Sequence, residues 1–371
     1  MNMYKTRCEA LYEWMGKEDI ALVMFEDAEG RRDPAIRWLT GQPGDAVLFL
    51  AAADRKSLLM PWDINMAHLF AEADAVVPYN DCGRIAIRAL PCAADHFRIK
   101  TRSRIEIPAV TPYPLFLNYQ KELPDYEVVC RNNGIAAEVE RRRMVKDEEE
   151  MRIYKTLASI TNGLIEKLEK NVKDKTLTTE TDVALFIESE ARKQGCEGTS
   201  FETLAAGPSR SFGIHAFPGY TSASFIGQGL SILDFGLTYQ GYASDVTMTF
   251  VHDATPEQEK LLSLMKQAYD LAFAMVKPGV SARDIAIAVD ELYGRNGRTL
   301  PHGLGHGVGL EIHEAPFIRS KSENPWILQR GMIVTIEPGV YDPALGGCRF
   351  ENDVLVTESA EALTETRIVR V

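Results

Sequence analysis

Glycines alternate with other residues along one short stretch, residues 302–316, which reads His-Gly-Leu-Gly-His-Gly-Val-Gly-Leu-Glu-Ile-His-Glu-Ala-Pro. Because the glycines remove side-chain bulk at alternate positions, a regular helix is disfavoured and other groups can approach the backbone closely. The stretch also holds three of the seven histidines of the chain, His302, His306 and His313. Neutral imidazole is the commonest nitrogen ligand of divalent metals and the usual proton carrier near neutral pH. The stretch therefore predicts a functional site, and the alternative is a glycine-rich loop with surface histidines.

Length and charge restrict the class of protein. A chain of 371 residues predicts two domains. The excess of 53 acidic over 41 basic side chains, a formal charge of -12, argues against nucleic acid or an anionic membrane as partner. The longest apolar run, residues 46–53, is far shorter than a membrane helix, and a basic-then-apolar signal pattern is absent from the first residues, so we expect a cytoplasmic protein. The six cysteines form no Cys-x-x-Cys pair, which predicts neither a disulfide framework nor a thiolate zinc site.

Residues 1–133 carry the pattern of a smaller α/β domain, for which we expect a role in assembly or as a lid. A helical stripe over residues 4–15 is followed by short apolar runs that predict strands. These runs are residues 20–25, 46–50, 57–60, 75–78, 104–107 and 127–130. The two histidines of this part, His68 and His96, lie apart from any cluster of acids, and we interpret them as structural or exposed.

A charged segment, residues 134–146, predicts a linker between this domain and a second domain, residues 147–371. Asp147 with Glu150 three residues later is typical of a helix start, and so is Thr255 followed by proline and Gln258. Two similar helix starts suggest an internal repeat. The sequence thus indicates an α+β domain of two related halves with pseudo-twofold symmetry, with helices outside and sheet inside.

Each half of the repeat supplies two carboxylates. Asp234 and Glu337 close apolar strand-like runs, and Asp245 and Glu351 follow them in the same order. We interpret residues 234–245 as a hairpin with Tyr239 and Gln240 as its two-residue loop, which places Asp234 directly opposite Asp245. Two like charges that face each other are destabilising unless a cation lies between them. The alternative is a pair of exposed carboxylates on a loose hairpin.

Glu337 and Glu351 are separated by an even number of positions, so pairing of their strands gives the same facing geometry, although the longer loop fixes the register poorly. Two Asp, two Glu and one His are too rich in oxygen for a closed structural zinc site. The set suits two hard or borderline cations, and ligand type alone leaves Mn²⁺, Co²⁺ and Zn²⁺ open. Two such ions can hold a bridging hydroxide, polarise a carbonyl and stabilise the oxyanion that results.

The order of these motifs resembles a known family. Asp-x10-Asp, His-x3-His-x6-His, Ile-Glu-Pro-Gly and Arg-x-Glu-x-Asp resemble the pita-bread metallopeptidase superfamily of creatinase, aminopeptidase P and prolidase. The resemblance extends from about Arg142 to the end of the chain, and the preceding domain is similar in size and pattern to that of the longer members. It implies a pita-bread catalytic domain preceded by a creatinase-type N-terminal domain, two divalent metal ions and a homodimer.

The resemblance also implies roles for individual residues. The metal ligands would be Asp234, Asp245, His306, Glu337 and Glu351. His215 resembles the histidine upstream of the first Asp, and His313 the histidine that contacts substrate, so both would donate hydrogen bonds to the substrate or the oxyanion. Glu337 would also relay a proton to the leaving nitrogen. His302 and Arg349 would support the site or the substrate, with Arg349 ordering Glu351.

The activity implied is hydrolysis of Xaa-Pro bonds, by an aminopeptidase or a dipeptidase, in a small peptide with proline at its second position. The sequence departs from the family at Met248, where arginine is common, and at Asn352, where aspartate is frequent. Neither is a ligand position, but a lost charge near a metal changes its ligands' basicity. Two alternatives stay open: a creatinase-like hydrolase or lyase of a small non-peptide molecule, and a peptide-binding module with a vestigial site.

Overall fold

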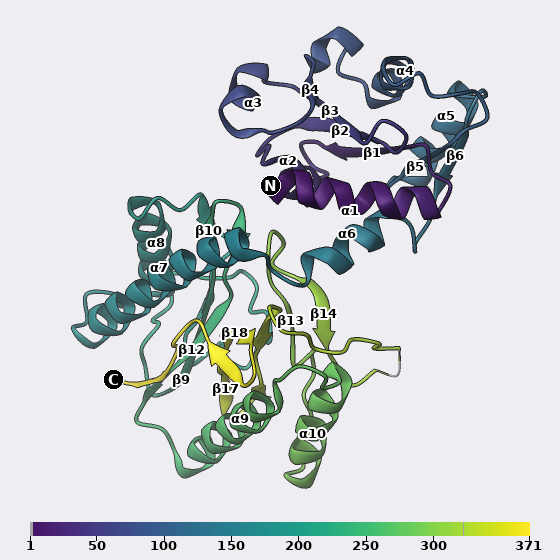
Figure 1. The fold of residues 1–371 in the computed structure, drawn as a ribbon. Helices are drawn as coiled ribbons and strands as arrows, with labels where there is room; N and C mark the ends of the chain where they lie inside the picture. The colour runs from purple at the N-terminus through teal and green to yellow at the C-terminus, as the bar shows by residue number, and fades with distance from the viewer. Residues whose placement is uncertain (1–2, 322) are drawn as a thin grey trace. The chain divides into compact units, whose positions relative to one another are not determined.

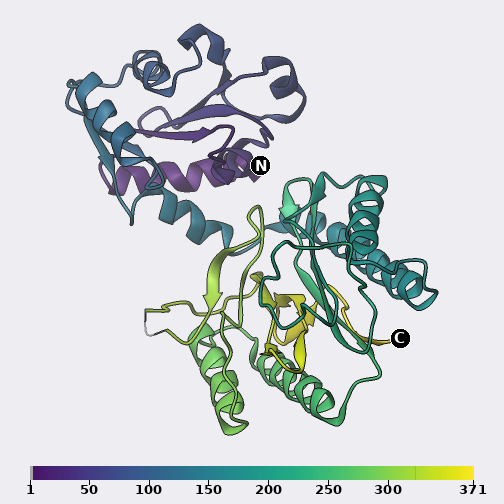
Figure 2. The same ribbon diagram turned by 180° about the vertical axis from the view of Figure 1, so that it is seen from behind.

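The computed structural model describes residues 3–321 and 323–371, which form two compact units (Figures 1 and 2). The first unit is Met1–Arg142 and the second is Arg143–Val371. Among the described residues, no helix is both long and apolar enough to cross a membrane.

A mixed six-stranded sheet forms the centre of the first unit, in the order β4-β3-β2-β1-β5-β6. All six strands expected in this part of the chain are present, and the buried run of β2 lies inside the sheet, paired with β1 and β3. The strands are β1 (Leu22–Asp27), β2 (Ala46–Ala51), β3 (Lys56–Pro61), β4 (Ala75–Val76), β5 (Arg104–Ile107) and β6 (Glu127–Cys130). The helices are α1 (Met3–Lys17), α2 (Pro34–Thr40), α3 (Ile64–Phe70), η1 (Tyr79–Cys82), α4 (Ala86–His96) and α5 (Tyr113–Glu122).

The charged segment expected to be a linker is mostly helical. Helix α6 (Ile135–Arg143) occupies it, and the boundary between the two units falls at the helix's last residue. The apolar side chains of Ile135 and Val139, one helical turn apart, are buried. Their burial accounts for ordered helix in a segment that is otherwise rich in charge.

Capped helices begin each half of the second unit. Asp147 and Glu150 form a capping box at the start of α7 (Glu148–Lys173), and Thr255 and Gln258 do the same for α9 (Pro256–Met275). Both predicted helix starts are thus confirmed. Each long helix is followed by a shorter one, α8 (Glu180–Lys193) or α10 (Ala282–Arg295).

The strands of the second unit repeat an order as well. In the first half β9 lies between β8 and β12, and in the second half β15 lies between β13 and β18. The first set comprises β7 (Gly198–Thr199), β8 (Leu204–Ala206), β9 (Gly229–Phe235), β10 (Leu237–Tyr239), β11 (Tyr242–Ala243) and β12 (Val246–His252). The second set comprises β13 (Gly305–Gly307), β14 (Glu314–Ile318), β15 (Ile333–Ile336), β16 (Gly339–Asp342), β17 (Gly346–Arg349), β18 (Asn352–Val356), β19 (Ala360–Ala362) and β20 (Ile368–Arg370).

Each half of the second unit has its own apolar core. One core packs α7 and α8 against β9 and β12, and the other packs α9 and α10 against β14 and β15. Figure 1 shows the two helix pairs at different ends of the unit with the strands between them. The two sheets meet where the Glu351 amide donates to the Thr247 carbonyl at 3.2 Å. Polar side chains on these strands therefore meet between the two cores.

Candidate metal centre

Asp234 and Asp245 are carried by two antiparallel strands, but the predicted register is wrong by two residues. Asp234 pairs with Thr247, and the tight turn is formed by Gln240 and Gly241 rather than by Tyr239 and Gln240. Both turn residues have positive φ, 49° and 84°, as a two-residue hairpin loop of this type requires. Because a shift of two residues keeps the same face, Asp245 still lies diagonal to Asp234 on its side of the sheet.

Glu337 and Glu351 face each other, as predicted from their even separation. Strands β15 and β18 are antiparallel, with Ile336 opposite Asn352. One further step in this register brings Glu337 opposite Glu351. The same register continues in β16 and β17, where Gly339 lies opposite Arg349, so one long hairpin delivers both glutamates.

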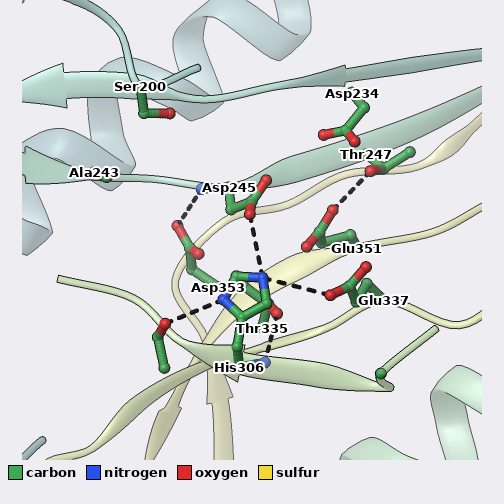
Figure 3. A network of polar contacts seen from close by, with 12 residues as sticks. Ser200, Asp234, Ala243, Asp245, Thr247, His306, Thr335, Glu337, Glu351 and Asp353 are labelled. Carbon is green, nitrogen blue, oxygen red and sulfur yellow. Dashed lines mark hydrogen bonds and ion pairs between the residues drawn. The ribbon is translucent and has the colours of Figure 1, made fainter. Parts of the chain in front are cut away.

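His306 contacts one member of each carboxylate pair (Figure 3). Its Nε2 is 3.5 Å from an oxygen of Asp245 and 3.4 Å from one of Glu337. Its Nδ1 is 3.1 Å from the carbonyl oxygen of Gly307. With Nδ1 donating to that carbonyl, Nε2 keeps its lone pair toward the acids, which is the tautomer that a metal ligand needs.

Glycines on both sides of His306 let its strand fit between two neighbours. A Cβ on Gly305 would lie 2.0 Å from the carbonyl oxygen of Thr335, and one on Gly307 would lie 2.2 Å from that of Ala315. These glycines are thus required for the close approach of β13 to β14 and β15. The expected exclusion of a helix here is confirmed.

Burial and mutual repulsion strongly affect the acids. Asp245 and Glu351 are buried, and burial followed by Glu351 raises the pKa of Asp245 well above its usual range. Burial and then Asp234 raise the pKa of Glu351 to about 8, and burial and then Glu351 raise that of Glu337 well above the usual value. Burial lowers the pKa of His306 to about 4, so the imidazole is neutral near pH 7. The protein alone therefore leaves this cluster short of positive charge.

The ligand atoms suit more than one cation. Three overlapping groups have ligand atoms within 4.8 Å of one another: Asp234, Asp245 and Glu351; His306, Glu337 and Glu351; and Asp245, His306 and His313. In addition, Oδ1 of Asp234 is buried and has no hydrogen-bond partner. A buried carboxylate oxygen without a donor costs free energy unless a cation contacts it. The donor set therefore fits divalent metal ions.

Thr247 was not identified from the sequence, although it organises the centre. Its hydroxyl donates to Oε2 of Glu351 at 2.7 Å and accepts from Nε of Arg349 at 3.1 Å. Arg349 also forms an ion pair with Asp234. Arg349, expected to order Glu351 and its neighbours, is therefore linked to Glu351 through Thr247. The available sequence signal was the position of Thr247, two residues beyond Asp245 on the same strand face.

His302 lies at the edge of the cluster and is held by Tyr341, another residue that the sequence did not reveal. Its Nε2 is 2.9 Å from the Tyr341 hydroxyl, and its Nδ1 is 3.7 Å from Oε2 of Glu337. The Tyr341 hydroxyl also accepts a hydrogen bond from Arg349 at 2.7 Å. Burial, followed by the charge of Arg349, lowers the pKa of His302 to about 4. His302 therefore contacts a candidate ligand as a neutral ring.

His313 is exposed, and its ring packs edge-on against that of His306 with centroids 4.3 Å apart. The next residue, Glu314, is buried and accepts from Lys146 at 2.7 Å and also from Arg143. Burial alone would raise the pKa of Glu314, but these two cations outweigh it and lower the pKa. The ion-paired Glu314 thus fixes the backbone next to His313.

A cavity of about 780 Å³ opens onto the cluster. His215, His302 and His313 line it together with the five candidate ligands. His215 lies on a loop before β9 and is exposed. The structure thus brings all the predicted site residues to one cavity.

The two departures from the family pattern lie outside the cluster. Met248 is fully buried in the core beneath α7 and α8. Asn352 donates to the Tyr269 hydroxyl at 3.2 Å and accepts from the Thr366 amide at 2.7 Å. Both side chains therefore have structural partners of their own.

Residues 130–358 match metallopeptidase family M24, and the chain belongs to this family. An uncharacterized peptidase of Bacillus subtilis, YqhT, is 30% identical over 329 residues, which cover 87% of this chain and 89% of that protein. An Xaa-Pro dipeptidase of Pyrococcus furiosus is 36% identical over 231 residues, which cover 60% of this chain and 64% of that protein. The match to the latter thus spans slightly less than two thirds of its length.

Solved structures show the same fold over nearly the whole chain. The prolidase of Pyrococcus horikoshii OT3 superposes with a TM-score of 0.84 at 23% identity, covering 98% of this chain and 99% of that one. An X-Pro aminopeptidase of Thermotoga maritima MSB8 gives a TM-score of 0.83 at 25% identity, with the same coverage. The chain is therefore a metal-dependent peptidase with a prolidase-like α/β fold.

We predict that Thr247→Val lowers the affinity for metal by about 10-fold to 100-fold, the usual effect of removing a hydrogen bond to a ligand. The valine keeps the shape but leaves Glu351 without its donor. Thr247→Ser keeps the hydroxyl and should restore most of the affinity. Competition with a chelating dye would measure the metal affinity of all three proteins. Equal metal affinities for Thr247→Val and wild type would contradict the role of Thr247 in holding Glu351.

A second prediction concerns pH. A raised carboxyl pKa means that the folded metal-free protein holds protons that the unfolded chain releases, so the cluster lowers stability as pH rises from about 4.5 toward 8. Metal ions displace those protons, so the rise in Tm on adding Mn²⁺ should grow over the same range. Calorimetry from pH 5 to 8 measures this rise, and Glu351→Gln should flatten its pH dependence. A rise in Tm that is constant or shrinks with pH would disprove the linkage.

Proposed function

We propose that this chain hydrolyses the bond between an N-terminal residue and a following proline, with two divalent metal ions at the cluster. The observation that carries the proposal is the convergence of four carboxylates and one imidazole from five segments on one cavity. The proposed metal ligands are Asp234, Asp245, His306, Glu337 and Glu351.

Two ions fit the overlap of the donor groups, because Asp245, His306 and Glu351 each belong to two of them. Mn²⁺, Co²⁺ and Zn²⁺ all suit this mixture of carboxylate and imidazole. When bound, such ions supply a water-derived nucleophile at neutral pH and polarise the substrate carbonyl. They also neutralise the charge that the protein itself leaves unbalanced.

The side chains around the cluster handle protons and orient the substrate. Glu337 takes a proton from the attacking water and delivers it to the proline nitrogen, which leaves as a strongly basic amine. His215 and His313, both exposed to the cavity, donate hydrogen bonds to the substrate carbonyl region. His302, held by Tyr341, lies beside Glu337, and Arg349 holds Asp234.

The substrate class is supported by the relatives and by the cavity. Two similar proteins bear the names Xaa-Pro dipeptidase and X-Pro aminopeptidase. Phe201, Ile214 and Phe217 add apolar surface to the cavity wall, which suits a proline ring. Proline lacks an amide hydrogen and has a fixed φ, so the bond before it needs a shaped site.

The wider architecture belongs to the same proposal. The repeated order of helices and strands supports a pita-bread domain with pseudo-twofold symmetry, beginning at about residue 147. We further propose that the N-terminal unit acts in assembly of a homodimer or as a lid. The net charge of -12 supports small peptides rather than nucleic acid as partners.

Substrate assays test the function directly. The metal-free protein, reloaded separately with Mn²⁺, Co²⁺ or Zn²⁺, should release the first residue from Ala-Pro, Met-Pro or Ala-Pro-Ala, and should leave Ala-Ala largely intact. The relative rates on Ala-Pro and Ala-Pro-Ala separate a dipeptidase from an aminopeptidase. Absence of turnover on all three proline peptides, combined with hydrolysis of creatine, would replace the proposal with a creatinase-like activity.

Glu337→Gln tests the proton relay. The amide keeps the size and one metal-binding oxygen but cannot accept a proton, so kcat should fall by about 10² to 10⁴. The rate is compared per fully metallated site, with metal content measured by mass spectrometry. Glu361→Gln, a change of the same kind on an exposed strand, serves as the control. A metallated Glu337→Gln enzyme with near wild-type kcat would leave Glu337 as a ligand only.

A further inference from the structure

His215 lies on an irregular loop, residues 207–221, between strands β8 and β9. The loop carries two exposed side chains that line the cavity, His215 and Phe217, and Phe217 is 91% exposed. An exposed loop with so little side-chain burial needs other contacts to keep an imidazole in one position. The contacts that fix its backbone therefore decide where His215 lies.

One buried carboxylate holds both ends of this loop. Glu180, the first residue of α8, is fully buried. Its Oε1 accepts from the Gly207 amide at 2.8 Å, and its Oε2 accepts from the Thr221 amide at 2.8 Å and the Thr221 hydroxyl at 2.6 Å. A single side chain thus joins the first and last residues of the loop.

Arg210 extends this connection into the loop. Its Nε donates to Oε1 of Glu180 at 3.1 Å, and its Nη2 donates to the Pro218 carbonyl at 2.7 Å. The ion pair balances the buried charge of Glu180, which would otherwise be costly. Arg210 therefore ties the two sides of the loop together on either side of His215.

The far end of the loop is fixed from the metal centre. Nη1 of Arg349 donates to the carbonyl of Ile214 at 3.1 Å, and the Gly347 amide donates to the Ser211 hydroxyl at 3.1 Å. His215 directly follows Ile214. The loop is thus held at its base by Glu180 and next to His215 by Arg349.

The corresponding helix of the second half begins without such a carboxylate. Thr179 caps α8 and Ser281 caps α10, and each receives the amide of an aspartate three residues later. The residue after the cap is Glu180 in the first half and the buried Ala282 in the second. A helix start of this kind therefore forms equally well around an alanine.

We propose that Glu180 is a positioning residue for His215. Its two oxygens accept four donors from both ends of the loop, and no neutral side chain of similar length offers that acceptor capacity. In Glu180→Gln one amide N–H group faces N–H or O–H donors, so the hydrogen bonds at one end of the loop are weakened. This inference rests on the proposed function only for the role of His215 in catalysis.

Two structural measurements test the hold of Glu180 without using activity. Trypsin should cleave after Arg210 at least about tenfold faster in Glu180→Gln than in wild type, since local opening governs such cleavage. In protein labelled with ¹³C at histidine, the His215 signal, assigned with His215→Ala, should shift or broaden, while those of His68 and His96 stay unchanged. Glu188→Gln, a pair-forming surface residue of the same helix, is the control and should match wild type in both.

Kinetic measurements then test whether Glu180 affects catalysis through the position of His215. At equal metal content, Glu180→Gln should lower kcat on Ala-Pro by about tenfold or more, with a smaller change in KM. In a His215→Ala background the same change should have little further effect. Thr221→Val, which removes only one donor to Glu180, should show a weaker loss of the same kind and covers the case that Glu180→Gln does not fold.

The outcomes separate the two proposals. A shifted His215 signal and faster cleavage in Glu180→Gln would support the positioning role even if the metal-loaded wild-type enzyme were inactive on every Xaa-Pro peptide. That inactivity of the wild type would refute the proposed function alone. An unchanged His215 signal and unchanged cleavage in folded Glu180→Gln would overturn the positioning role. Equal losses of kcat from Glu180→Gln with and without His215 would also overturn it, because the effect would then be purely structural.

Discussion

The second unit is arranged around a cluster of acidic side chains held close together. Asp245 and Glu351 are buried, Asp234 and Glu337 lie beside them, and burial followed by mutual repulsion raises the pKa values of Asp245, Glu337 and Glu351. Proteins rarely bury so many acids without equal positive charge. Arg349 pairs with Asp234 and leaves the others to be balanced by ions from solution. The same arrangement favours the binding of cations at the cluster and makes the metal-free protein sensitive to pH.

The fold meets this electrostatic demand by placing Asp234 on a strand and the other three acids directly beside the ends of strands. Two capped helix pairs cover separate apolar cores, and the strands between them carry the acids to the line where the sheets meet. The exposed histidines lie on less regular backbone, and each is stabilised by a buried acid close to it in structure, Glu314 for His313 and Glu180 for the His215 loop. In the proposed function, metal binding and substrate orientation thus depend on different supporting residues.

The sequence predicts much of this site because the spacing of residues along a strand decides which face each side chain occupies. The even separation of Glu337 and Glu351 fixes their shared face whatever the loop does, and the alternating glycines at 303–309 exclude a helix. The register predicted for Asp234 is wrong because the tight turn consists of Gln240 and Gly241, both with positive φ. The predicted turn left out Gly241, although glycine is favoured where φ is positive. Thr247, Tyr341 and Glu180 could not be assigned, since each contacts a partner that lies far away in the chain.

We propose that two divalent ions share this one cluster. Crystals grown with Mn²⁺ and measured at a wavelength where manganese scatters anomalously would locate the ions without reference to activity. We expect two anomalous peaks, both in contact with Asp245 and Glu351, one next to Asp234 and the other next to His306 and Glu337. A single peak in the cluster, or strong peaks only elsewhere on the protein, would contradict it.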